Sequence, residues 1–170
     1  AIPVQLNLVR EMAKKDDVRV IALRYPHRRD HYKVFDAEVH SLGVGAWTRG
    51  LGRLKLWWDA IQLIRNQHRE KPFDVLHAMW ADETGLIAGW AGRLLNIPVV
   101  VSVAGGELVG FEDIDYGLQR SRFSRWTVGQ ALKHASAIVV ACTYVQGLIA
   151  SAGYHIAENK IHRIALGVDV

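Results

Sequence analysis

Residues 99–108 read VVVSVAGGEL, and this stretch decides what kind of fold the chain adopts. Its run of β-branched apolar residues predicts a buried strand, and the two glycines and the glutamate predict a loop at the end of that strand. A phosphate-binding P-loop would need lysine and then serine or threonine where Phe111 and Glu112 stand, and Glu112 would repel phosphate. The dinucleotide pattern G-x-G-x-x-G also fails, because Glu107 occupies the place of its second glycine. The strand therefore carries a loop that serves some other ligand.

The composition is that of an ordinary globular domain with a mild positive charge. The chain has 170 residues, of which 50% are hydrophobic and 22% charged, and its net charge is +4. The length predicts one domain over residues 1–170, and the charge favours anionic partners such as nucleotides and sugar phosphates. The single cysteine, Cys142, suits a reducing compartment, so we expect a cytoplasmic protein. Arg93 and the break at residues 96–98 divide the apolar residues 84–103 into a helix and a strand, which argues against a transmembrane span.

The rest of the chain alternates predicted strands and helices around this stretch. Residues 25–35 are polar and basic and are predicted to form a loop, whereas residues 36–42 alternate as an edge strand would. Apolar strands separated by helices predict an α/β fold, a Rossmann-like and mostly parallel sheet with helices on both faces. The predicted strands are residues 18–23, 36–42, 75–78, 99–103, 137–141 and 161–165, and the predicted helices are residues 2–15, 51–70, 83–95, 117–134 and 143–153.

Two of the predicted helices have distinctive faces. In helix 83–95, small residues stand four apart, which allows the helix to approach a sheet closely. In helix 51–70, we expect one apolar stripe to face the core, and Leu56 and Leu63 fall outside it. The small residues are Gly85, Ala88, Gly89 and Gly92, and the stripe is Leu54, Trp57, Trp58, Ile61 and Ile64.

Ligands of open α/β sheets bind beyond the carboxyl ends of the strands, so the strand ends select the candidate site. No residue is assigned as catalytic, and no metal ligand is predicted, because the acidic residues 112–115 are more typical of a polar loop. The candidate substrate-binding residues are His77 after the third strand, Gly105, Gly106 and Glu107 after the fourth, Thr143 after the fifth, and Gly167 and Asp169 after the sixth.

Each of these candidates also has a plainer interpretation. His77 could be a hydrogen-bonded histidine at a strand end, and Glu107 a loop residue or a helix cap. The glycines most often mark backbone with an unusual φ angle, and Thr143 is more typical of a helix cap than of a ligand-binding residue. The sequence leaves these alternatives open.

Four stretches together resemble a known family. They are FDVLHA at residues 73–78, NIPVVVSV at 96–103, ASAIVVACT at 135–143 and ENKIHRIALGVD at 158–169. In this order and spacing, they are similar to the amino-terminal half of group 1 (family 4) glycosyltransferases, and residues 2–15 resemble the first helix of that half. The resemblance covers nearly the whole chain.

The resemblance implies a GT-B enzyme, in which two Rossmann-like domains face each other across a cleft. The amino-terminal domain mainly binds the acceptor, and the second domain makes most contacts with the nucleotide-sugar donor. The family retains the anomeric configuration and usually needs no metal in the active site, so we expect no cofactor beyond the donor itself. The loop at residues 104–107 would then shape the site for the acceptor and the transferred sugar.

The resemblance also implies that the enzyme's first strand precedes residue 1 and that its second domain follows residue 170. We therefore expect residues 1–170 alone to transfer no sugar. The missing strand would lie between the strands at residues 18–23 and 75–78. We expect one of three outcomes: another copy of the chain fills the place, an upstream segment fills it, or the two strands pair directly.

Three residues depart from the family pattern: Ala104 stands where a histidine is common, Met79 replaces the second histidine of H-x-H, and Leu166 replaces asparagine. A non-catalytic sugar- or partner-binding module is therefore an alternative. An oxidoreductase is disfavoured because G-x-G-x-x-G is missing, and a nucleic-acid partner because no element clusters basic and aromatic residues. Related enzymes often act on lipid-linked acceptors, so we also expect peripheral contact with the inner membrane face through Leu56 and Leu63.

Overall fold

The computed structural model describes residues 3–25, 28–43, 45, 50–165 and 167. It divides into two compact units: unit 1 comprises residues 1–64 with 166–170, and unit 2 comprises residues 65–165. Among the described residues, no helix combines the length and the hydropathy that a membrane span requires.

Unit 1 is built on a three-stranded sheet with the order β1-β3-β2. Helix α1 (Pro3–Ala13) precedes β1 (Arg19–Ala22), β2 (Arg29–Val34) and β3 (Ala37–Leu42), and α2 (Leu51–Glu70) begins in unit 1 and ends in unit 2. Strand β1 runs parallel to β3, whereas β2 and β3 form an antiparallel hairpin. Ala37, Val39 and Ser41 are buried on one face of β3, and Glu38 and His40 lie half-buried on the other.

The prediction of a loop over residues 25–35 is wrong, because residues 29–34 form strand β2. Along this strand, Asp30, Tyr32 and Val34 are half-buried, and they alternate with the exposed Arg29, His31 and Lys33. This alternation is a strand signal, but the basic residues mask it in the sequence. Strand β3 is consequently the central strand of its sheet rather than the predicted edge strand, because β2 pairs along its outer side.

Helix α2 has the predicted bounds, but only part of the predicted stripe is inside: Trp57 and Ile64 are buried as expected, and Ile61 is half-buried. The buried residues are Leu56, Trp57, Ala60 and Ile64. Leu54 and Trp58, which were expected inside, are 56% and 64% exposed, and Leu56 is only 1% exposed. Leu56 therefore cannot lie against a membrane, and the exposed apolar residues of α2 are instead Leu51, Leu54 and Trp58.

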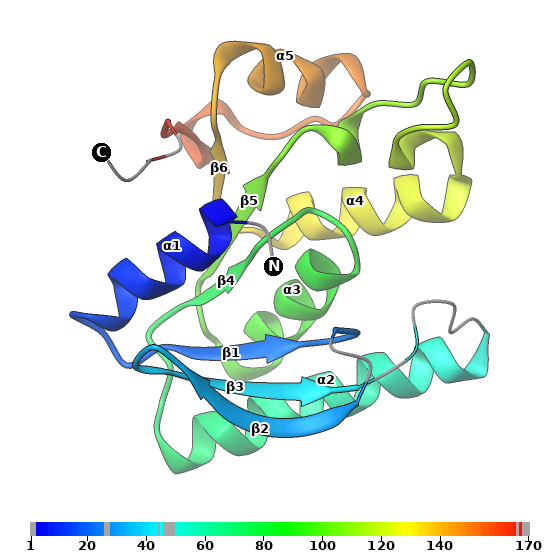
Figure 1. The fold of residues 1–170 in the computed structure, drawn as a ribbon. Coiled ribbons are helices and arrows are strands. Elements are labelled where there is room, and N and C mark those ends of the chain that lie inside the picture. The colour runs from blue at the N-terminus through cyan, green and yellow to red at the C-terminus, as the bar shows by residue number, and fades with distance from the viewer. Residues whose placement is uncertain (1–2, 26–27, 44, 46–49, 166, 168–170) are drawn as a thin grey trace. The chain divides into compact units, whose positions relative to one another are not determined.

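Unit 2 holds the predicted parallel sheet, with the strand order β4-β5-β6-β7 (Figure 1). All neighbouring strands in it run parallel. Its elements are β4 (Leu76–Ala78), α3 (Glu83–Leu95), β5 (Val99–Val103), the short helices η1 (Gly106–Leu108) and η2 (Leu118–Arg120), α4 (Arg122–His134), β6 (Ala137–Val140), α5 (Thr143–Ser151), η3 (Glu158–Lys160) and β7 (Ile161–Arg163). The Rossmann-like fold class is confirmed.

The core of unit 2 forms where the central strands meet the helices. Val101, Ile138 and Val140 are fully buried, and they belong to one cluster with Val128 of α4 and Ile149 of α5. Each such side chain contributes about 1.5–3 kcal/mol when it leaves water, so these strands hold the sheet in place. The carboxyl ends of β4, β5 and β6 then meet at one edge of the sheet, because the strands are parallel.

The small-residue face of α3 packs closely, as predicted, but against α4 as well as the sheet. A Cβ atom added at Gly85 would lie 2.6 Å from the Cβ of Ala131 in α4, and one at Gly92 would lie 2.3 Å from Cγ2 of Val99 in β5. These glycines therefore set the distance between α3 and its neighbours.

The strands that were expected to flank a missing strand belong to different sheets. Strand β1 is hydrogen-bonded to β3, and β4 to β5. Direct pairing of the two strands, one of the three expected outcomes, is therefore wrong for the described residues. The other two outcomes stay predictions.

Candidate functional site

The carboxyl edge of the unit 2 sheet is organised around the carboxylate of Glu107. This side chain, in η1, accepts hydrogen bonds from the backbone N–H groups of Ala81 (3.3 Å), Ala104 (3.2 Å) and Gly105 (2.8 Å). Ala81 follows β4, whereas Ala104 and Gly105 follow β5. Glu107 is only 4% exposed, so these bonds form in a site largely removed from water. The carboxylate therefore ties together the loops that follow two neighbouring strands.

This geometry gives Glu107 a structural task at the predicted site. Its oxygens are turned toward backbone N–H groups, and its own carbonyl oxygen accepts a bond from Nε2 of Gln119. The amide of Gln119 is bonded in turn to the hydroxyl of Tyr154, which donates to the carbonyl of Arg125. A role of Glu107 in substrate binding stays a prediction, and it would act by shaping the loop.

Of the two glycines before Glu107, Gly105 is required by the backbone of the loop, and Gly106 makes room for a neighbouring side chain. Gly105 has a φ angle of 117°, a conformation that side chains with a Cβ rarely adopt. Gly106 begins η1, and a Cβ added there would lie 2.7 Å from the hydroxyl oxygen of Tyr116. The plainer interpretation, that these glycines mark unusual backbone, therefore holds for Gly105 but not for Gly106, while contact of either with a substrate stays a prediction.

Asp82 is a second carboxylate at this edge, and the sequence analysis did not select it. It caps the amino end of α3, where its Oδ1 accepts bonds from the backbone N–H (2.8 Å) and the hydroxyl (2.9 Å) of Thr84. Burial raises the pKa of Asp82, and the negative charge of Glu107 raises it further. Its ionisation therefore costs stability as pH rises through the raised pKa of the folded state. The signal in the sequence was an aspartate directly before a predicted helix.

His77 lies in β4 rather than in the loop that follows it. Its Nε2 shares a 2.8 Å hydrogen bond with Oγ of Ser102 in β5, and the ring is half-buried. Burial lowers the pKa of His77, because it disfavours the charged imidazolium and so favours the neutral form. The stability that depends on this neutral form is present above the unfolded pKa of about 6.5 and is lost as pH falls toward the folded pKa.

The remaining predicted site residues make fewer contacts with the loops at this edge of the sheet. Thr143 is the first residue of α5 and is exposed, and Cys142 rather than Thr143 holds the N-cap position. The interpretation of Thr143 as a helix cap is therefore wrong. The first turn of α5 does reach the loop, because a Cβ at Gly105 would lie 3.6 Å from Cγ2 of Val145. Gly167 is exposed, and Asp169 lies outside the described residues.

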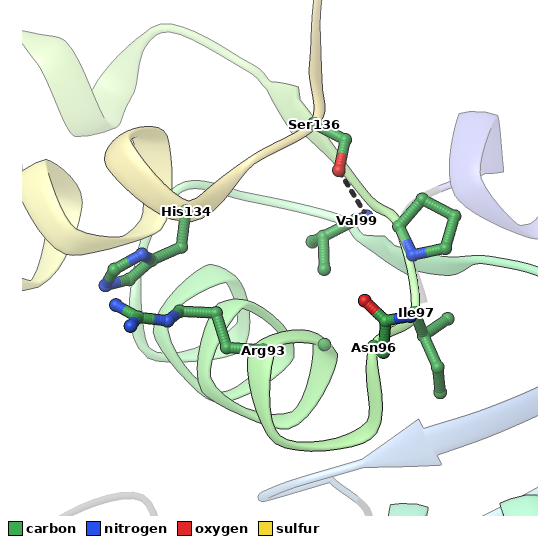
Figure 2. A pocket seen from close by; sticks show the side chains of 8 residues that line it. Arg93, Asn96, Ile97, Val99, His134 and Ser136 are labelled. Carbon is green, nitrogen blue, oxygen red and sulfur yellow. Dashed lines mark hydrogen bonds between the residues drawn. The ribbon is translucent and has the colours of Figure 1, made fainter.

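A hollow of about 350 Å³ lies at the opposite, amino-terminal edge of the sheet. Figure 2 shows Arg93 and His134 on one side of it, and Ser136, whose hydroxyl accepts a bond from the N–H of Val99 at 3.1 Å. Burial and then the charge of Arg93 lower the pKa of His134. The carboxyl end of α3 points toward this hollow, and its dipole disfavours anions, so we place the candidate site at the other edge.

Comparison with known proteins now fixes the family. Residues 2–167 match the protein family described as "Glycosyl transferase 4-like domain". The chain therefore belongs to this family, and the predicted resemblance to the amino-terminal domain of family 4 glycosyltransferases is confirmed. No curated protein matches the chain.

Two solved structures are similar to the chain. One is a Listeria monocytogenes protein assigned as UDP-N-acetylglucosamine 2-epimerase, with a TM-score of 0.57, 12% identity, and coverage of 92% of this chain and 40% of that one. The other is HepE of Anabaena in complex with UDP, with a TM-score of 0.49, 16% identity, and coverage of 79% and 32%. The chain thus spans less than half the length of either protein, and at this identity the first likeness shows the fold alone.

Proposed function

We propose that the full-length protein is a retaining glycosyltransferase that moves a sugar from a nucleotide-sugar donor to an acceptor, and that residues 1–170 bind the acceptor. The observation that carries the proposal is the family match over residues 2–167. The donor is a co-substrate, and neither a further cofactor nor a metal ion takes part in the transfer.

The arrangement of residues at the carboxyl edge of the unit 2 sheet supports this assignment of the acceptor site. Glu107 fixes the loops after β4 and β5, and helices α3 and α5 begin at the same edge. Asp82 caps the amino end of α3, whereas no side chain caps that of α5, whose partial positive charge suits the hydroxyl oxygens of an acceptor. Ala104 is exposed in this loop, so the small methyl group leaves room for a bulky acceptor where a histidine would stand.

The test of the proposed function is transfer by the full-length protein with panels of nucleotide sugars and glycan, lipid-linked and small-molecule acceptors. We expect release of the nucleotide together with a product heavier by one sugar. Residues 1–170 alone should give no product above background, since the donor must be held and oriented by the second domain. Binding of sugars by the full-length protein without any transfer would instead support the non-catalytic binding module.

A pair of variants separates a substrate-binding role of His77 from a structural one. His77→Ala removes the imidazole, whereas Ser102→Ala removes only its 2.8 Å hydrogen-bond partner. If His77 contacts the acceptor, kcat/KM of the full-length enzyme should fall about tenfold or more in His77→Ala and less than about threefold in Ser102→Ala. Equal losses in both variants, with matching losses of stability, would assign His77 to the sheet alone.

Peripheral contact with a membrane is part of the proposal, and it now rests on a different face of α2. Leu51, Leu54 and Trp58 are exposed at helical spacing, and the exposed Lys55 lies among them. Leu54→Ser combined with Trp58→Ser should lower co-sedimentation with phosphatidylglycerol vesicles about tenfold, while Leu94→Ser, which alters an exposed leucine of α3, should not. Wild-type protein that stays in the supernatant would overturn the membrane role.

A further inference from the structure

The hairpin of unit 1 gathers two histidines and a glutamate on one face. His31 of β2 lies directly opposite His40 of β3 in the antiparallel register. Their rings are stacked, with centroids 4.2 Å apart and planes inclined by 11°. Glu38 stands two residues before His40, so its side chain leaves β3 on the same face. One ligand atom from each of the three side chains lies within 4.8 Å of the other two.

The hairpin holds these three groups in a fixed arrangement. Six residue pairs set the register between β2 and β3, and the opposite face of β3 is anchored by the buried Ala37 and Val39. The side chain of His40 is 14% exposed, whereas His31 is exposed, so the cluster is open to solvent on one side. An ion could therefore enter without any rearrangement of the backbone.

We propose that His31, Glu38 and His40 bind one divalent transition-metal ion of the Zn²⁺ class. Two imidazoles and one carboxylate form a donor set that suits Zn²⁺, Co²⁺ or Ni²⁺ better than Mg²⁺ or Ca²⁺, which prefer oxygen ligands. Tetrahedral bonds of about 2.0–2.1 Å place ligand atoms about 3.3 Å apart. Nε2 of His40 and Oε2 of Glu38 are 3.9 Å apart, and the two stacked imidazoles must tilt out of their parallel arrangement before a nitrogen of each points at the same ion. The exposed His31 has room to make this rotation, and water completes the coordination.

Neighbouring charges limit how tightly this site binds. In the sheet register, Arg19 of β1 and Lys33 of β2 flank Glu38 on its two sides. Arg19 is paired with Asp17 at 3.1 Å, which offsets part of its charge, whereas Lys33 is exposed. These cations compete with a metal ion for Glu38, so the affinity of the site for the ion is moderate. Binding of the ion therefore stabilises the hairpin, but folding does not depend on it. The site lies in unit 1, and it is independent of the proposed sugar transfer.

The test is metal binding by the full-length protein without an affinity tag. Zn²⁺ is titrated in competition with a chromophoric chelator, and Co²⁺ is used for its visible absorption bands. We expect one equivalent to bind, with absorption typical of nitrogen and oxygen ligands, and Zn²⁺ to raise the melting temperature. His31→Ala, His40→Ala and Glu38→Gln should each weaken Zn²⁺ binding about tenfold or more and abolish the thermal shift.

The matched control is His155→Ala, which removes an exposed histidine from unit 2 and should bind Zn²⁺ like the wild type. His31→Ala is the decisive variant, because His31 is exposed and its loss should leave the fold intact. Two outcomes would overturn the proposal: wild-type protein without saturable binding of Zn²⁺, or equal affinity in the wild type and His31→Ala. Sugar transfer is not a readout, so failure of this proposal is distinct from failure of the proposed function.

Discussion

Glu107→Leu should lower the free energy of unfolding of unit 2 by about 2–4 kcal/mol, because the buried N–H of Ala81 and the partly buried N–H groups of Ala104 and Gly105 lose their acceptor, and an unsatisfied buried group costs about 1–3 kcal/mol. Leucine fills much of the same space but accepts no hydrogen bond. Glu107→Gln should cost less, since its amide oxygen still accepts while its NH₂ group faces other donors. Urea denaturation of the full-length protein measures the loss.

The matched control for Glu107 is Glu112→Leu. The side chain of Glu112 is 80% exposed, and its 3.5 Å ion pair with Arg120 is open to solvent, so its loss should cost less than about 1 kcal/mol. Amide hydrogen exchange adds a local readout: exchange at Ala81, Ala104 and Gly105 should accelerate in Glu107→Leu before that of the β5 strand. Equal stability of the two leucine variants would show that the carboxylate of Glu107 does not brace the loops.

Gly85→Ala should destabilise the protein even though alanine is the better helix former. The added Cβ would lie 2.6 Å from the Cβ of Ala131 and 2.9 Å from the carbonyl oxygen of Trp80. Overpacking of this kind costs about 1–3 kcal/mol, and the clash with a backbone oxygen cannot be relieved by a side-chain rotation. The gain in helix propensity of about 1 kcal/mol offsets only part of this cost.

Gly147→Ala tests the same substitution at a helix position where the added Cβ meets no neighbouring atom. Gly147 lies within α5, and nothing stands within 4 Å of the position that its Cβ would take. This variant should raise the free energy of unfolding by about 0.5–1 kcal/mol, the opposite sign to Gly85→Ala. Thermal and urea unfolding of both variants give the comparison, and stabilisation by Gly85→Ala would contradict the close packing of α3 on α4.

The elements of unit 2 could be predicted from the sequence because local signals agree there with the tertiary structure. The run at residues 99–103 is apolar on both faces, and it forms β5 with the predicted bounds. Helix α3 also has its predicted bounds, because Asp82 and Asn96 cap its two ends. In unit 1, by contrast, β2 carries Arg29, His31 and Lys33 on its exposed face, and the turn at Phe35 lacks the usual asparagine or glycine.

Some features depend on neighbours that a single sequence does not reveal. The apolar residues of α2 do not form one narrow stripe, so the sequence alone does not select the face that is buried, which consists of Leu56, Trp57, Ala60 and Ile64. Glu107 could be predicted to stand at the site, but its hydrogen bond with Ala81 joins residues that are 26 positions apart in the sequence. The pairing of His31 with His40 likewise depends on a hairpin register that was hidden within a predicted loop.

Strand β2 also bears on how separate molecules meet. In the described sheet of unit 1, β2 pairs with β3 along one side and lies at the edge of the strand order. Unpaired backbone at a sheet edge invites another chain to add a strand, which is a common start of aggregation. Arg29 and Lys33 are exposed on β2, so two molecules that approach edge to edge bring like charges together. The residues that hid this strand in the sequence therefore help to keep neighbouring molecules apart.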